Sequence, residues 1–136
     1  MELIDFLFPG IFFKVLHEQY TGMATLHKAV KECFINAFYD NKLDLYSVEE
    51  KQELFIIIKS KDHKNYKQYV YIGFYGKFLD VFHFVRFDES FFKRTAEMKL
   101  DGEMTESEMI DRMGLLSWID ATRKCLEQAI KEVKDQ

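Results

Sequence analysis

Residues 66–87 read YKQYVYIGFYGKFLDVFHFVRF, and this stretch decides the fold. It consists of two ten-residue runs, 66–75 and 78–87, that are rich in aromatic and β-branched residues, as strands are. The two runs are separated only by Gly76 and Lys77, and a two-residue loop with glycine first is typical of a type II′ hairpin. The stretch therefore predicts an antiparallel pair of strands.

The predicted turn also sets which side chains share a face, because alternate residues of a strand point to opposite sides of a sheet. One face of the first strand takes Tyr66, Gln68, Val70, Ile72 and Phe74. The other takes Lys67, Tyr69, Tyr71, Gly73 and Tyr75. If helices cover only the first face, Tyr69, Tyr71 and Tyr75 form an exposed row. Tyrosine is enriched at protein interfaces, so this row is a candidate interaction surface.

Upstream of the hairpin, the segments 43–48 and 53–60 are interpreted as two further strands. The second contains the short apolar run LFIII at residues 54–58, which is too short for a helix of its own. Ser47 and Glu50 have the spacing of a helix capping box, so residues 47–53 could instead form a short helix. The sequence leaves that alternative open.

Helical periodicity dominates both ends of the chain. Apolar residues at three- and four-residue steps predict one helix over residues 11–20, with Gly22 as its stop, and a second over 23–39, ended by Asp40 and Asn41. Thr105 and Glu108 form a capping-box pattern that opens a C-terminal helix of some thirty residues, or about 45 Å. A helix that long exceeds the width of a small sheet. We expect it either to break near Gly114 or to project at one end and pack against something else.

Together these elements predict an α+β fold within one domain, residues 1–136. It comprises two N-terminal helices, an antiparallel meander of three or four strands, and a long C-terminal helix packed across it. The chain has 136 residues, of which 48% are hydrophobic and 31% charged, so it can form a core and is not disordered throughout.

Charge argues against a nucleic-acid partner, because the formal net charge is -4. Residues 70–73 and 80–87 resemble the aromatic RNP2 and RNP1 strands of RNA-recognition motifs, whose aromatic side chains stack on bases. However, Asp80 and Val81 replace the basic residue and glycine that open RNP1. A tight hairpin also joins the two segments, whereas a helix and a further strand separate them in that family.

The compartment predicted from the sequence is the cytoplasm. Cys33 and Cys125 lack the spacing of a disulfide framework, and we expect two reduced thiols. The apolar N-terminus carries Glu2 and Asp5 and no basic region before them, unlike a signal peptide. No apolar run is long enough to cross a bilayer, and no membrane attachment is expected. Lysine far outnumbers arginine and alanine is scarce, which favours a bacterial or phage source.

We expect no catalytic activity, no bound metal and no cofactor. His17, His27, His63 and His83 lack metal-ligand spacing, and no nucleophile motif or phosphate-binding loop is present. A calcium loop opening at Asp101 would have Glu106 where glycine is required and Arg112 where the bidentate glutamate belongs. We interpret the acidic stretch 97–111 as a solvated loop that leads into the N-terminus of a helix.

Two further groups are candidates for binding. Lys61, Lys64 and Lys67 form a local positive region that could steer an acidic partner. His83 and Trp118 could line a cavity between the sheet and the C-terminal helix, in which His83 and a tyrosine hydroxyl would be the polar groups.

The leading hypothesis is a non-catalytic protein-binding module, such as a regulator, an inhibitor, an immunity-type protein or a chaperone-like adaptor. It would use the aromatic sheet face, the C-terminal helix or both, and could be a homodimer. The alternative is a small-molecule-binding domain with an aromatic cavity.

Overall fold

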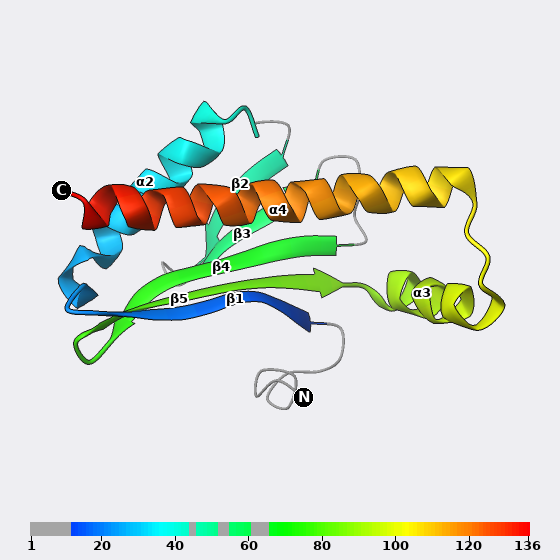
Figure 1. The fold of residues 1–136 in the computed structure, drawn as a ribbon, viewed down its shortest axis with the longest axis horizontal. Coiled ribbons are helices and arrows are strands. Elements are labelled where there is room, and N and C mark those ends of the chain that lie inside the picture. Colours follow the sequence, from blue (N-terminus) through cyan, green and yellow to red (C-terminus); the bar gives the residue numbers. More distant parts are fainter. Residues whose placement is uncertain (1–11, 44–45, 52–54, 61–65) are drawn as a thin grey trace.

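The computed structural model describes residues 12–43, 46–51, 55–60 and 66–136, and in them five strands form one antiparallel sheet (Figure 1). In chain order the strands are β1 (Phe12–Thr21), β2 (Tyr46–Lys51), β3 (Phe55–Ser60), β4 (Tyr66–Tyr75) and β5 (Phe78–Phe87). Across the sheet the order is β1-β5-β4-β3-β2. Strands β2 to β5 are thus the predicted meander of four, and β1 adds a fifth strand beside β5.

Two helices, α2 (His27–Asp40) and α4 (Glu106–Lys134), pack against one face of this sheet (Figure 1). Their inward residues meet those of β3, β4 and β5 in one hydrophobic cluster. The fully buried side chains of the cluster include Val30, Phe34 and Phe38 of α2, Ile58 of β3, Val70 of β4, Leu79 and Val81 of β5, and Leu126 of α4. Burying a side chain of this size contributes about 1.5–3 kcal/mol, so this layer dominates the stability of the fold.

The β4–β5 hairpin forms as predicted. Both strands have the expected bounds, and Tyr75 pairs with Phe78 across the turn. Gly76 has a φ of 58°, whereas the φ of Lys77 is not positive. A type I′ turn requires positive φ at both positions and a type II′ turn only at the first, so the turn is of type II′. Both predicted faces are confirmed, because Tyr66, Gln68 and Val70 are buried beneath the helices.

The first predicted helix is wrong, since residues 12–21 form strand β1 and not a helix. A β-bulge explains the misleading pattern, because the register against β5 shifts between Lys14 and Leu16. An extra residue at a bulge breaks the alternation of a strand. Val15 and Leu16 therefore both pack against the core, and adjacent apolar residues that point the same way imitate helical spacing. Gly22, with a φ of 75°, ends the strand instead of a helix.

The second predicted helix begins later than expected. A short 3-10 turn, η1 (Ala24–Leu26), precedes α2, which ends at Asp40 with Asn41 as its C-cap, as predicted. The ambiguity over residues 47–53 is resolved in favour of a strand as far as residue 51, since β2 pairs antiparallel with β3 from Tyr46↔Ser60 to Lys51↔Phe55, and residues 52–53 lie outside the described residues. The strand lies about three residues further along than residues 43–48.

A helix that the sequence analysis missed, α3 (Glu89–Asp101), follows β5 directly. It includes Glu97, so the acidic segment is not all loop. The sequence signals at both ends of this helix are common ones. The Asp88 side chain accepts a hydrogen bond from the Phe91 backbone N–H as N-cap, and Gly102, with a φ of 67°, ends the helix.

Helix α4 is continuous over 29 residues and does not break at Gly114. Its predicted capping box is present, with Thr105 and Glu108 bonded reciprocally. At about 43 Å it is longer than the ten-residue strands, which span about 33 Å. Its N-terminal part therefore extends past the end of the sheet, where α3 lies beside it (Figure 1).

Gly114 gives a first prediction, because it lies inside α4 with an ordinary helical φ and a Cβ added there would meet nothing within 4 Å. Gly114→Ala should raise the free energy of unfolding by about 0.5–1 kcal/mol, the usual cost of glycine inside a helix. Urea unfolding followed by circular dichroism measures the change. Gly102→Ala is the control and should destabilise, because that position has a left-handed φ. A destabilised Gly114→Ala would contradict the open space around Gly114.

Candidate protein-interaction surface

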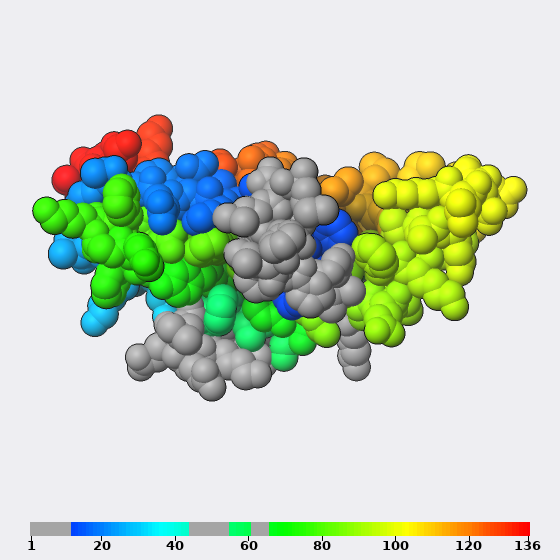
Figure 2. Space-filling view, turned by 90° about the horizontal axis from the view of Figure 1, so that it is seen from below, coloured from blue at the N-terminus to red at the C-terminus, as the bar shows by residue number. Residues whose placement is uncertain are grey.

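The projecting part of the molecule is a helical hairpin formed by α3 and the first turns of α4. No residue of α4 before Leu115 is buried, so residues 106–114 lie beyond the hydrophobic core. Figure 2 shows this hairpin, yellow to yellow-green, forming one end of the molecule. A segment outside the core keeps its position only if other contacts hold it.

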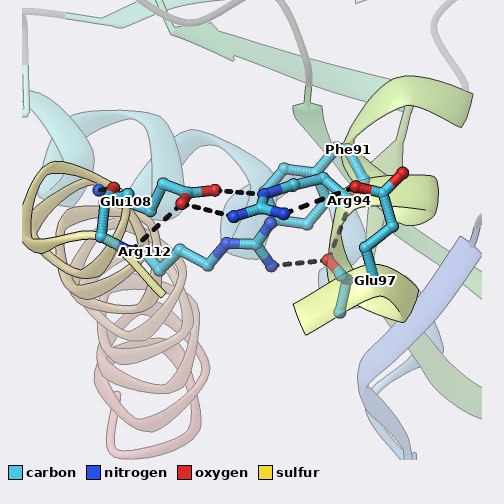
Figure 3. A network of polar contacts seen from close by, with 7 residues as sticks. Phe91, Arg94, Glu97, Glu108 and Arg112 are labelled. Atoms are coloured by element: carbon cyan, nitrogen blue, oxygen red, sulfur yellow. Dashed lines mark hydrogen bonds and ion pairs between the residues drawn. The ribbon is translucent and has the colours of Figure 1, made fainter. Parts of the chain in front are cut away.

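The first such contact is an ion pair between α3 and α4. Arg94 donates from Nε to Glu108 Oε2 at 2.6 Å and from Nη2 to Glu108 Oε1 at 2.8 Å, a bidentate geometry (Figure 3). Hydrogen bonds from Arg94 and from the Thr105 backbone lower the pKa of Glu108 to about 2. One carboxylate thus caps α4 and ties it to α3.

The second contact is a stack that runs from the sheet through both helices. The Phe87 and Phe91 rings lie parallel with centroids 4.5 Å apart. The guanidinium of Arg112, from α4, lies 4.0 Å from the Phe91 centroid (Figure 3). Arg112 also donates from Nη1 to Thr95 Oγ1 at 2.6 Å. Arginine stacks well on aromatic rings because its charge is planar and weakly hydrated. The hairpin is therefore held rigidly against the end of β5.

The outward side of this braced hairpin is apolar. We use the name α4 stripe for Met109, Ile110, Met113 and Leu116, whose exposed fractions are 49%, 70%, 60% and 67%. Met104, just before the N-cap, is 43% exposed. Leu115 and Trp118, on the opposite side of the same helix, are buried. Single exposed apolar residues are common, but a contiguous group of large ones marks an interaction site.

The two ends of the α4 stripe differ in charge. Before it come the exposed acidic residues Glu103 and Glu106. After it come Arg123 and Lys124, which are balanced by two carboxylates, because Asp120 accepts a short hydrogen bond from Arg123 and lies 3.7 Å from Lys124 Nζ, and Glu127 lies 3.5 Å from Arg123. The surface thus changes from acidic to charge-balanced along the helix.

A cleft of about 340 Å³ opens between the two helices on another side of the hairpin. It is lined by Ser90, Phe91, Arg94, Ser107, Glu108, Asp111 and Arg112. The two arginines that line it are already engaged by Glu108, Thr95 and Phe91. The cleft therefore lies beside the contacts that hold α3 to α4.

The predicted tyrosine row lies on the sheet face opposite α2 and α4. Tyr75 is 74% exposed beside the hairpin turn, while Tyr69 and Tyr71 are half-buried among other rings. Phe55 contacts both, with centroid distances of 6.3 Å to Tyr69 and 6.0 Å to Tyr71. The Tyr71 ring lies over Gly73, where its hydroxyl occupies the place of a Cβ. Tyr69 and Tyr71 thus belong to an aromatic cluster that extends over several strands, whereas Tyr75 lies exposed at the end of β4.

Of the three lysines of the predicted positive region, the structure describes one. Lys67 is half-buried on the same sheet face, and Lys61 and Lys64 lie outside the described residues. Lys67 comes opposite Lys59 in the β3–β4 pairing and opposite Arg86 in the β4–β5 pairing. Three cations therefore adjoin on this face.

The two residues predicted to line a cavity are packed in the core. Trp118 is 3% exposed, with its ring 5.5 Å from that of Tyr66, and His83 is fully buried. His83 Nε2 donates to Gln68 Oε1 at 2.5 Å, Gln68 Nε2 donates to Thr122 Oγ1 at 2.9 Å, and Thr122 donates to the Trp118 carbonyl. Neither His83 nor Trp118 lines the cleft between α3 and α4.

Desolvation by burial, together with the positive charge of Arg123, lowers the pKa of His83 to about 3. The imidazole is therefore neutral at physiological pH. Its Nε2 carries the hydrogen that Gln68 accepts, and its Nδ1 finds no partner among the described residues. The sequence analysis did not single out Gln68, although a polar residue on the helix-facing side of a central strand is the signal of such a pair.

The sequence points to the α4 stripe only through the length of the C-terminal helix, because a projecting end is one of the two alternatives that this length leaves open. In the described part of the chain, no helix is both long and apolar enough to cross a membrane. Comparisons of the chain with models of protein families, with curated proteins and with solved structures found no match.

Proposed function

We propose that this chain is a non-catalytic protein-binding module that docks a partner protein on the α4 stripe. The observation that carries the proposal is the group of four large apolar side chains, each about half exposed or more, of which three lie on the part of α4 beyond the core and Leu116 lies just after it. Leaving them in water forgoes the stabilisation that burial gives, about 25 cal/mol per Å² of apolar area. A partner that covers them would recover it.

Two features suit the α4 stripe to this role. The Arg94–Glu108 and Phe91–Arg112 contacts fix the hairpin before binding, so little conformational entropy is lost on association. Methionine, which supplies two of the four side chains, is enriched at interfaces and adapts to the surface it meets. Roles such as regulator, inhibitor, immunity-type protein or adaptor would all use a surface of this kind.

A reducing setting such as the cytoplasm is part of the same proposal. Both cysteines of the chain are free thiols. Burial raises the pKa of Cys125, and burial together with the negative charges of Glu132 and Glu32 raises the pKa of Cys33. Thiols with raised pKa values react slowly, because the thiolate is the reactive form. Their role here is to pack.

Native mass spectrometry of the chain, purified gently from its own source, tests the proposed function. The wild type should be found in a complex, and Ile110→Glu should release it as a bare chain, because the substitution places a charge on the α4 stripe. Tyr75→Ser is the matched control, since Tyr75 is equally exposed but lies at the β4–β5 turn. It should keep the complex. Loss with Tyr75→Ser and not with Ile110→Glu would move the interface to the sheet face, and a wild-type bare chain would contradict a binding module.

A further inference from the structure

We infer that the partner on the α4 stripe is a second copy of this chain, with the two α4 helices packed antiparallel across a two-fold axis near Met113. The inference rests on the proposed function and names its partner. Three properties of the α4 stripe carry it: its spacing, the charges at its ends and its area.

The spacing is that of a helix–helix seam. Met109, Met113 and Leu116 follow one another at steps of four and three residues, the a/d pattern of paired helices. A two-fold interface brings the same surface of both copies together. With the axis near Met113, Met109 of one copy would lie beside the partner's Leu116, and Met113 would lie beside its own counterpart. The seam is therefore complementary to itself.

The charges favour the antiparallel direction. In that arrangement, the acidic end of one stripe, with Glu103 and Glu106, lies beside the other end of the second stripe, where Arg123 and Lys124 are balanced by Asp120 and Glu127. A parallel pair would instead bring the two acidic ends together. Like charges oppose an interface, so the antiparallel direction is the favoured one.

The area agrees with a weak to moderate dimer. From their exposed fractions, Met104 and the four residues of the α4 stripe expose on the order of 600 Å² of side-chain surface, against about 800 Å² contributed by each partner in a standard interface. The flanking charged side chains would supply the remainder as a polar rim. A second copy thus covers the apolar group without needing surface from the sheet.

Analytical ultracentrifugation of the purified full chain over a concentration series tests the inference. The wild type should approach twice the chain mass of 16.3 kDa at micromolar to tens of micromolar concentration. Met113→Glu should weaken association at least a hundredfold, because it brings two carboxylates together at the axis. Gln128→Glu, the same change of charge at an exposed α4 position outside the stripe, should dimerise as the wild type does. Circular dichroism checks that each variant keeps its helix content.

A charge exchange tests the direction of packing. With the axis at Met113, Glu106 of one copy lies beside the partner's Asp120. Glu106→Lys should therefore strengthen the dimer several-fold, and adding Asp120→Lys should cancel that gain, because like charges would again face each other. If Glu106→Lys does not strengthen association, the antiparallel arrangement is wrong.

The outcomes separate the inference from the proposed function. A chain that stays monomeric at 100 µM overturns the inference. If native mass spectrometry then shows a complex with a different polypeptide that Ile110→Glu abolishes, the proposed function stands with another partner. A dimer that survives Met113→Glu overturns the assignment of the α4 stripe as the dimer interface.

Discussion

Replacing Leu126 by Ala should lower the free energy of unfolding by about 2–5 kcal/mol, while the same replacement at Leu116 should change it by less than about 0.5 kcal/mol. The two leucines lie ten residues apart in one helix and have the same helix propensity. Leu126 is fully buried in the core that α4 forms with α2 and the sheet, whereas Leu116 is 67% exposed. The cost of truncation comes from lost contacts and from the cavity left behind, and Leu116 has little of either to lose.

Urea unfolding followed by circular dichroism measures both variants at low protein concentration, where association contributes least. Leu126→Ala should shift the midpoint with an unchanged m value, the sign of a change in stability alone. Repeating Leu116→Ala at high concentration separates its two roles, because a deficit that grows with concentration reports lost association. A large deficit at every concentration would mean that Leu116 is buried within its own chain, and the α4 stripe would not be a free surface.

The sequence showed that α4 carries apolar residues along its whole length, but not that they belong to two different sides. Met109, Met113 and Leu116 precede Ile119, Leu126, Ile130 and Val133 in what reads as one stripe. Seven residues turn a helix by about 20° less than two full turns, so such a stripe drifts around the axis. The residues over the sheet are buried and those beyond it are not. Where the sheet ends is a property of the tertiary structure, which periodicity does not contain.

Local signals did predict the hairpin and the start of α4, because the residues that decide them are neighbours in sequence. The Gly76 turn and the Thr105–Glu108 capping box are of this kind. Strand β1 failed for the opposite reason, since the bulge that disguised it exists only in its pairing with β5. The ion pair between α3 and α4 could not be predicted either, because Arg94 and Glu108 lie in different helices and one of those helices was not predicted.

The buried pair of His83 and Gln68 leads to the second large effect, a loss of stability in mild acid. In the folded chain the pKa of His83 is held at about 3 by burial, whereas an unfolded histidine has a pKa of about 6.5. Between these values the unfolded chain binds one proton more than the folded chain at this site. Stability therefore rises with pH across this window, and it falls by up to about 1.4 kcal/mol for each unit that the pH decreases.

The interval from pH 6 to pH 5 isolates this contribution, because Glu108, whose pKa is lowered from 4.5 to about 2, loses its share of stability only below that interval. His83→Gln is the informative variant, since a glutamine amide can still donate to Gln68 but does not titrate. It should be less stable than the wild type at pH 7, because the replacement disturbs a fully packed site. Its stability should nevertheless fall less steeply between pH 6 and pH 5, as urea unfolding at each pH would measure. If both proteins lost stability at the same rate, the folded chain would be accepting a proton at His83, and the imidazole would have water or another polar partner at Nδ1.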